Sequence, residues 1–427
     1  MPEPVVISDY VCPVCHGLCD DLTVTLRDGE APQISPPCER LQDWIAELET
    51  RPTEIAFVRG SSASLGDAIS EACELLRKSE LPLLTGLSAT TTDIVRAAVH
   101  LAETVDAVID PCCGTGDSSA LEAFQRLGIS GASLGEIRQR SDLILFWNAD
   151  PLRLSERFLD RFCGESDGEF LKQGRADRHL VAIAGNRVDR PEAAFDQWIE
   201  WSPEEQVEAL ASLRLALQEG DSSSLGGDSI LSDLYVKLVN CTYGTAFFDF
   251  SEFPKALRTL IVKELTLLVR ELNDRTRFVM QSLGPETSLL TARQSICWQT
   301  GGAGAVRFVD AAPVYDPIVN SAVRVLVSGE TDCCVLVGGE WIGRLPESAI
   351  AHLSRCDTIL LSPTVRELPF QPTVEIRTST PGYDEPGTIT RLDGVPLRLR
   401  PLVSPRHLSA AEILDRVRRE LPVLGDA

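Results

Sequence analysis

Short apolar runs alternate with longer amphipathic segments along most of the chain after residue 50. Short apolar runs bounded by turn residues are typical of buried strands, and longer segments with a helical period are typical of helices. The alternation therefore predicts strand–helix units built around mainly parallel sheets. The expected strands are EIAFV (54–58), PLLTG (82–86), DLILFW (142–147), HLVAIAG (179–185), TAFFDF (245–250), RFVMQS (277–282), DCCVLVGG (332–339) and DTILLS (357–362).

Two segments show the helical period most clearly. In SLGDAISEACELLRK (64–78), one face carries Ala, Ile, Cys and Leu side chains while Asp, Glu and Lys fall on the other. Cys73 lies on the apolar face, so it is expected to be a small core residue. HLSAAEILDRVRRELP (407–422) predicts a helix that closes the chain.

The fold class expected is α/β, with doubly wound parallel-sheet lobes and a small N-terminal cysteine-ligated module. The chain has 427 residues, too many for one hydrophobic core. GDSSSLGGDS (220–229) is rich in Gly and Ser, and either separates two lobes or forms a loop inside one. The expected domains are the N-terminal module (1–50), a first lobe (51–165, completed by 340–380), a second lobe (166–339) and a C-terminal segment with the closing helix (381–427).

The charge and composition of the chain restrict the classes of molecule that it is expected to bind. The 63 acidic and 40 basic residues give a net charge of -23, which disfavours binding to nucleic acid or to anionic lipid. The longest apolar runs are far shorter than the roughly 20 residues of a membrane helix. MPEPVVISDY lacks the basic and apolar regions of a secretory signal, so we expect a cytoplasmic protein with no membrane partner.

The thirteen cysteines are expected to be thiols or metal ligands rather than disulfides, because no leader is seen in a chain of this length. Cys12, Cys15 and Cys19 have C-x2-C-x3-C spacing, and Cys38 follows in PPCERL. Four thiolates that converge can hold an iron–sulfur cluster or a structural zinc ion, and this spacing favours the cluster. His16 competes as a ligand only if the loop is folded differently. The alternative to a metal centre is that the four cysteines are unligated thiols in an N-terminal loop.

Four segments together resemble the B subunit of formylmethanofuran dehydrogenase, in the molybdopterin oxidoreductase superfamily. They occur in the family's order along nearly the whole chain: CPVCHGLCDD (12–21), LGEIRQRSDLILFWNADP (134–151), CWQTGGAGAVRFVDAAPVYDP (297–317) and RLDGVPLRLRP (391–401). From its own residues, without the resemblance, RLDGVPLRLRP is expected to be either a solvated edge strand or a contact with another protein of a complex.

The resemblance implies a four-iron four-sulfur cluster on Cys12, Cys15, Cys19 and Cys38, and a tungsten or molybdenum pterin between two doubly wound lobes. In the family, a cysteine or selenocysteine binds the metal, a histidine follows it, and an arginine comes from a downstream segment. Aligned without gaps, these positions fall on Gly116, Asp117 and Asp310. Cys112 takes the ligand position only if the register shifts.

A glycine cannot bind tungsten, and a carboxylate in place of a guanidinium reverses the charge that an anionic substrate meets. We therefore expect the pterin to be absent and the redox site lost. The chain then resembles the B subunit of the bacterial formyltransferase/hydrolase complex, in which formyl groups are released as formate. Its implied partners are the amidohydrolase-like A subunit and the C and D subunits of the formyltransferase, and the chain is not expected to be catalytic by itself. The alternative is the B subunit of an active dehydrogenase that interconverts carbon dioxide and formate.

Overall fold

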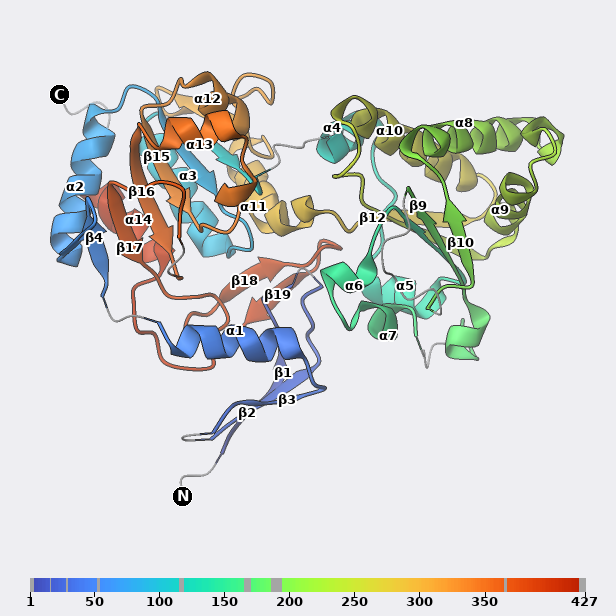
Figure 1. The fold of residues 1–427 in the computed structure, drawn as a ribbon, viewed down its shortest axis with the longest axis horizontal. Helices are drawn as coiled ribbons and strands as arrows, with labels where there is room; N and C mark the ends of the chain where they lie inside the picture. The colour runs from blue at the N-terminus through green and yellow to red at the C-terminus, as the bar shows by residue number, and fades with distance from the viewer. Residues whose placement is uncertain are drawn as a thin grey trace. The chain divides into compact units, whose positions relative to one another are not determined.

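The computed structural model of the chain describes residues 4–15, 17–27, 30–51, 54–114, 119–164, 170–185, 194–364 and 367–421. The chain forms two compact units, each with its own sheet (Figure 1). The first unit comprises Met1–Gly116, Ser288–Arg391 and Pro396–Ala427, and the second comprises Asp117–Thr287 and Leu392–Val395.

The first unit contains a nine-stranded sheet in the order β14-β13-β7-β6-β15-β16-β17-β4-β5. Five parallel strands form its centre: β7 (Val108–Pro111), β6 (Pro82–Gly86), β15 (Cys333–Val337), β16 (Asp357–Ser362) and β17 (Val374–Arg377). Antiparallel strands close both edges: β13 (Val306–Val309) and β14 (Ala312–Tyr315) on one side, β4 (Ala56–Val58) and β5 (Ser61–Ala63) on the other. The chain runs from β6 to β7 in one direction and later from β15 to β17 in the other, so the strand order reverses between β6 and β15.

Helices cover both faces of this sheet. One core contains residues of α2 (Leu65–Lys78), α3 (Thr92–Thr104), α11 (Leu290–Thr300) and α14 (Ala410–Glu420). The other contains residues of α12 (Ala322–Ser328), η5 (Ile342–Arg344) and α13 (Glu347–Leu353). Successive residues of β15 alternate between the two cores, Cys333 in the first and Cys334 in the second. The expected doubly wound α/β lobe is therefore confirmed.

The N-terminal residues form an antiparallel sheet of β1 (Val5–Tyr10), β2 (Leu22–Leu26) and β3 (Gln33–Ser35), followed by α1 (Glu39–Glu49). Their core is completed by Tyr383 and Leu402, from the last part of the chain, near the hairpin of β18 (Gly387–Thr390) and β19 (Pro396–Leu399). The Tyr10 hydroxyl also donates to the Gly382 carbonyl at 2.8 Å. The segment shares its core with the C-terminal segment, and the cysteine-ligated module expected for residues 1–50 stays a prediction.

The second unit has a fully parallel sheet in the order β10-β9-β8-β11-β12. These strands are β10 (Gln197–Glu200), β9 (His179–Ala184), β8 (Leu143–Trp147), β11 (Tyr243–Phe248) and β12 (Arg277–Ser282). The main core lies under α4 (Ser119–Leu127), α8 (Pro203–Glu219), α9 (Ser229–Asn240) and α10 (Lys255–Leu272). Shorter helices, α5 (Leu134–Arg140), α6 (Pro151–Leu154) and α7 (Phe158–Phe162), complete the unit, and Phe158 of α7 packs on Phe146 and Phe247.

All eight expected strands and both expected helices are present, with ends shifted by a few residues. The unit boundaries lie elsewhere than the sequence placed them: the second unit begins at Asp117, and residues 288–339 belong to the first because β15 pairs between β6 and β16. Residues 220–229 lie inside the second unit, where Gly220 ends α8 with φ 75° and Leu225 is buried.

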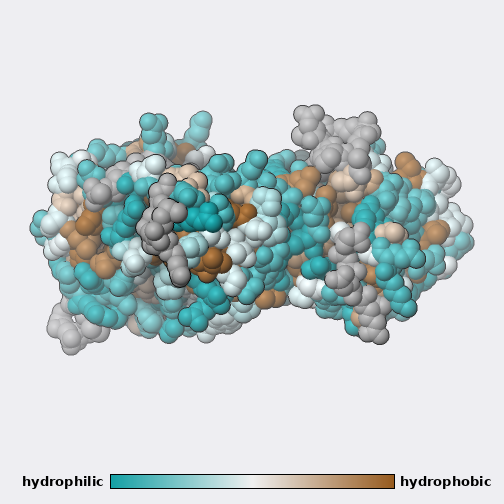
Figure 2. All heavy atoms as spheres, turned by 90° about the horizontal axis from the view of Figure 1, so that it is seen from below, coloured by the Kyte–Doolittle hydropathy of each residue, from teal (hydrophilic) through white to brown (hydrophobic). Residues whose placement is uncertain are grey.

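The described helices include none with the length and apolar content that a membrane span requires. The face seen in Figure 2 is mainly hydrophilic, with apolar side chains in small separate groups. Such groups are normal on a folded protein and need no further explanation.

Candidate functional site

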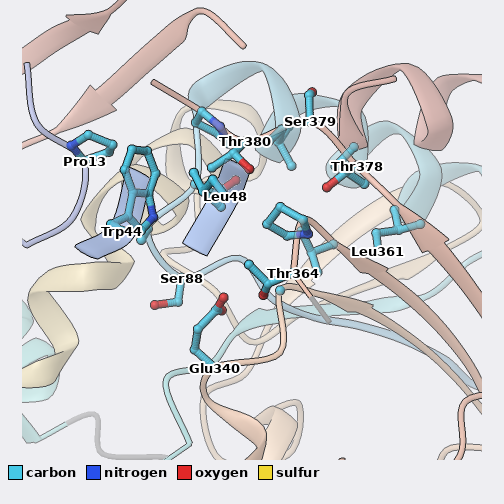
Figure 3. A pocket seen from close by; sticks show the side chains of 18 of the residues that line it. Pro13, Trp44, Leu48, Ser88, Glu340, Leu361, Thr364, Thr378, Ser379 and Thr380 are labelled. Carbon is cyan, nitrogen blue, oxygen red and sulfur yellow. The ribbon is translucent and has the colours of Figure 1, made fainter. Parts of the chain in front are cut away.

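A cavity of about 250 Å³ opens at the carboxyl ends of the parallel strands of the first unit. It lies between the loop after β6 (Ser88–Thr90) and the loop after β15 (Val337–Glu340), where the strand order reverses. Open α/β sheets bind ligands at this position, because the loops diverge there. Further walls come from the cysteine loop, α1 and the segments after β16 and β17: Pro13, Val14, Trp44, Glu47, Leu48, Pro363, Thr364, Thr378, Ser379, Thr380 and Pro381 (Figure 3).

The loop after β6 has an unusual backbone. Leu87 and Ala89 have φ of 58° and 49°, a left-handed conformation that side chains other than glycine rarely adopt. Hydrogen bonds from Leu87 N to Val337 O (3.1 Å) and from Ala89 N to Ser288 O (2.9 Å) hold the loop there. At Gly86 a Cβ atom would lie 2.2 Å from Val337 O, so only glycine allows the approach to β15. Backbone strain of this kind clusters at functional sites.

Hydroxyl groups dominate the polar wall of the cavity. Thr90, exposed by 4%, and Thr364 each have an Oγ1 atom with no hydrogen-bond partner in the described part of the chain. The only charged side chains among the described lining residues are Glu47 and Glu340. Carboxylates repel anions, so this lining suits a neutral or cationic group that can pair with hydroxyls.

A buried polar network fixes the hydroxyls along one wall. Ser379 Oγ donates to Glu385 Oε2 at 2.6 Å, and Thr380 N donates to Asp384 Oδ1 at 2.6 Å. The Arg51 guanidinium donates to Thr380 Oγ1. Burial, reinforced by the nearby Asp384 carboxylate, raises the pKa of Glu385 to about 7. Hydrogen bonds with these ionisable groups therefore fix the orientation of Ser379 and Thr380 in the cavity wall.

The cysteine loop lies beside this cavity, because Pro13 and Val14 belong to its wall. Cys12 N donates to Cys19 O at 2.8 Å and Leu18 N donates to Cys15 O at 3.0 Å, so the loop returns on itself. Cys12, Cys19 and Cys38 pack in one hydrophobic cluster with Tyr10 and Leu22. Burial raises the pKa of Cys12 well above its usual value, and the negative charges of Cys15, Cys19 and Cys38 add to the effect. The four thiols are thus close enough to interact.

Four neighbouring thiols are the donor set that iron–sulfur clusters and structural zinc prefer. Among the residues that the structure describes, however, no group of three His, Cys, Asp or Glu side chains has the arrangement of a formed metal site. His16 lies outside the described residues. Cys12, Cys19 and Cys38 thus share one cluster, but the described residues do not have the geometry of coordination, and the ligand set stays a prediction. No disulfide joins any of the thirteen cysteines, all of which are described.

Cys112 is a core residue. It follows β7, is exposed by 3%, and packs with Trp341, Ile342 and Leu345 in a core of the first unit. Its amide donates to Gly86 O at 2.9 Å, and its sulfur accepts a hydrogen bond from Gly114 N at 3.2 Å. To reach a metal, Cys112 would have to leave an apolar core.

Of the other positions carried over from the family, only Asp310 lies within the described residues. Gly116 and Asp117 lie outside the described residues. Asp310 is exposed in the two-residue turn between β13 and β14. Because β13 runs antiparallel to β7, that turn lies at the start of β7, where Ala311 N donates to Asp106 Oδ1 at 3.0 Å. Cys112 lies at the opposite end of the same strand.

Sequence reasoning missed the residues that line the cavity. A signal for them exists in the sequence: LSATT follows β6 and GGE follows β15 directly, and the carboxyl ends of parallel strands meet at one edge of a sheet. Only the strand order, which the sequence does not give, shows that these two segments are neighbours.

No protein-family model matches the chain. The B subunit of tungsten-containing formylmethanofuran dehydrogenase 2 from Methanocaldococcus jannaschii is 27% identical over 411 residues, 94% of each chain. Its counterpart from Methanococcus maripaludis is 24% identical, over 96% of this chain and 97% of that one. The B subunit of the formyltransferase/hydrolase complex Fhc from Methylorubrum extorquens is 28% identical over 304 residues, 68% of this chain and 75% of that one.

A chain of the crystal structure of the M. extorquens formyltransferase/hydrolase complex FhcABCD, solved with methylofuran, superposes with a TM-score of 0.70. It is 25% identical, and the match covers 85% of this chain and 98% of that one. Fold and site define an α/β protein with two doubly wound units and an N-terminal cysteine loop. The family expected from the motifs is confirmed, because the chain is a homologue of the B subunits of formylmethanofuran dehydrogenase and of the Fhc complex.

Proposed function

We propose that the chain is the B subunit of a formyltransferase/hydrolase complex that converts formyl groups to formate in one-carbon metabolism. The observation that carries the proposal is the structural match to a chain of the FhcABCD complex over 98% of that chain. The partners would be the amidohydrolase-like A subunit and the C and D subunits of the formyltransferase. The thirteen cysteines without a disulfide are in keeping with a cytoplasmic location.

Within the complex the chain is a structural partner without a redox site of its own. Two observations support this role: Cys112 lies in an apolar core, and the described cavity lining offers carboxylates but neither Lys nor Arg. A pterin dinucleotide carries a pyrophosphate, which needs cationic or N–H partners. The cavity of about 250 Å³ is also below the roughly 300–1,000 Å³ of pockets for drug-sized ligands. These features of the described residues support the proposal that no pterin is bound.

The competing function, that of the B subunit of an active dehydrogenase, is favoured by one observation. The two dehydrogenase relatives align along 94% and 96% of this chain, farther than the Fhc relative does. The two functions predict different metal contents for the purified complex. The complex should be purified through a tag on this chain and tested for the A, C and D subunits, for formate release and for metal. Formate release without tungsten or molybdenum is expected, whereas about one such atom per chain would overturn the proposal.

We also propose that Cys12, Cys15, Cys19 and Cys38 hold a metal centre, a four-iron four-sulfur cluster in the first place and zinc in the second. The support is that Cys12, Cys19 and Cys38 pack in one cluster in a segment with a small core. A metal there would stabilise the segment.

The substitution Cys12→Ser should remove iron and sulfide, or zinc, from the purified chain, because a hydroxyl is a poor ligand for these metals. The matched control is Cys73→Ser, since Cys73 is equally buried but lies in α2 among other core residues. Elemental analysis and the visible absorption of the cluster give the result without any activity assay. An unchanged metal content in Cys12→Ser would contradict the proposal.

A further inference from the structure

Two cysteines outside the site described so far form a close thiol pair. Cys334 lies on β15, Cys356 lies directly before β16, and their sulfur atoms are 3.8 Å apart. Because Cys334 pairs with Thr358 across the two strands, Cys356, two residues earlier, projects to the same face of the sheet. Cys333 projects to the opposite face, into the other core. Only one member of the adjacent Cys333–Cys334 pair can therefore meet Cys356.

The two thiols differ in access to solvent. Cys334 is exposed by 0%, whereas Cys356 is partly exposed and follows the end of α13. Contact with the Cys334 thiol lowers the pKa of Cys356, while that of Cys334 is raised. Asp332 and Asp357 also face Cys356, and their negative charges oppose its ionisation. The pair thus combines an accessible sulfur with a buried one, the arrangement of an attacking and a resolving thiol.

The backbone allows the two sulfurs to approach. A disulfide needs an S–S distance of about 2.0 Å, so the present separation must shorten by about 1.8 Å. Cys356 lies in a turn, where its amide donates to His352 O at 3.1 Å, rather than inside the ladder between β15 and β16. The closure can therefore be taken up by rotation of the Cys356 side chain and by movement of this turn, which lies outside the ladder.

We propose that Cys334 and Cys356 are a reversible disulfide modification site that responds to peroxide. The Cys356 thiolate attacks one oxygen of hydrogen peroxide, so that an S–O bond forms, the O–O bond breaks and hydroxide leaves, taking up a proton to become water. The sulfur of Cys334 then attacks the resulting sulfenic acid. The S–S bond forms, the S–O bond breaks, and a second water leaves with the proton of Cys334. Two thiols are oxidised by two electrons and one peroxide is reduced.

The bond would affect the neighbouring cavity. Cys334 and Cys356 enclose the connection from β15 through α13 to β16, and this connection contains Val337, Gly338 and Glu340 of the cavity wall. A disulfide would fix both ends of this connection and restrict the movement of that wall. The inference does not depend on the proposed function of the chain.

Peptide mapping tests the proposal on the full chain within its complex. The reduced complex is treated with hydrogen peroxide, remaining thiols are alkylated, and trypsin cleaves after Arg324, Arg344, Arg355 and Arg366. The two cysteines then lie on separate peptides, 325–344 and 356–366, which only a disulfide can join. We expect the joined peptides in oxidised wild type, with fragment ions that place the bond on Cys334. Dithiothreitol should separate them.

The matched variants are Cys334→Ser and Cys333→Ser, adjacent buried positions on opposite faces of one strand. Cys334→Ser should lose the joined peptides, and Cys333→Ser should keep them. Attachment through Cys333, or oxidation of the exposed Cys297 while Cys356 stays reduced, would overturn the proposal. Since the fragment ions assign the bond in the wild-type chain, the result does not depend on whether the variants fold.

Discussion

A buried carboxyl group, that of Glu385, holds a hydroxyl of the cavity wall in the first unit. Glu385 is exposed by 8%, and the only described hydrogen bond of its side chain is the one it accepts from Ser379. A carboxylate that is buried beside Asp384 is costly to ionise, and its raised pKa expresses that cost. An ionised Glu385 can only accept a hydrogen bond from Ser379, whereas a protonated Glu385 can also donate one to the Ser379 oxygen.

The pKa of Glu385 predicts a pH-dependent stability. Below pH 4.5 both the folded and the unfolded chain hold the proton, and between pH 4.5 and about 7 only the folded chain keeps it. Folding is therefore favoured at low pH, and this contribution is lost as the pH rises through about 7. The loss amounts to about 3 kcal/mol at most, from 1.36 kcal/mol per pKa unit.

Glu385→Gln removes the ionisation and keeps an acceptor for Ser379. Relative to wild type, the variant should gain up to about 3 kcal/mol in free energy of unfolding between pH 5 and pH 8. Urea denaturation at both pH values measures this difference. The exposed Glu74→Gln is the control and should change by no more than about 0.5 kcal/mol between the two pH values. An equal response of both variants would refute the assignment.

Some positions inside the sheets must be glycine because a larger side chain would clash with a neighbouring strand, and composition does not reveal this. Gly244 lies on β11, opposite Phe278 of β12, and an added Cβ atom would lie 2.1 Å from the Phe278 ring. Phe278 is itself buried in the core of the second unit, so the ring cannot turn away freely. The close approach of the two strands therefore depends on the missing side chain at Gly244.

Gly244→Ala should lower the free energy of unfolding by about 1–3 kcal/mol, the usual cost of adding a methyl group to a filled core. Gly131→Ala is the control, because no atom lies within 4 Å of the corresponding Cβ position. This control should change stability by less than about 0.5 kcal/mol. A chemical denaturation series on both variants decides the point, and equal stability of the two would show that the core accommodates the methyl group.

The central strands were predictable from sequence because they are buried on both faces and therefore consist of continuous apolar residues, as in LILFW and CCVLV. The short strands at or near the edge of the first sheet were not predictable in this way. β7 reads only VIDP, and the β13–β14 hairpin turns through Asp310 and Ala311, both at positive φ without the glycine that usually marks such a turn. Carrying the family's arginine position onto Asp310 therefore placed it on a turn, away from Cys112.

For the site, spacing alone predicted the cysteine loop, since Cys12, Cys15 and Cys19 lie close together in sequence. The cavity and the Cys334–Cys356 pair join residues far apart in the chain, so they depend on strand order. Strand order follows from the packing of whole units, which local periodicity does not encode. The same reason explains why residues 288–339 were assigned to the wrong side of the expected boundary between the lobes.

The hydrophobic cores of the two units are built from different residues. The described core residues of the second unit come from segments between Ala123 and Met280, and those of the first unit come from the remaining chain. Leu336 on β15 and Leu145 on β8 occupy equivalent places, each fully buried at the centre of its sheet. Regions with separate cores open with separate free energies, which native-state hydrogen exchange can measure.

Leu336→Ala should therefore lower the opening free energy of the amides in β6 and β15 by about 2–5 kcal/mol, the range for a leucine truncated in a filled core. The amides of β8 and β11 should change by less than about 0.5 kcal/mol, as expected for sites without shared partners. Leu145→Ala is the reciprocal variant and should show the opposite pattern, so that each substitution serves as the control for the other. Hydrogen exchange followed by mass spectrometry resolves the four strands on separate peptides. If either substitution destabilised both sheets equally, the two cores would have to be regarded as one cooperative unit, and the division of the chain at Asp117 and Thr287 would lose its energetic meaning.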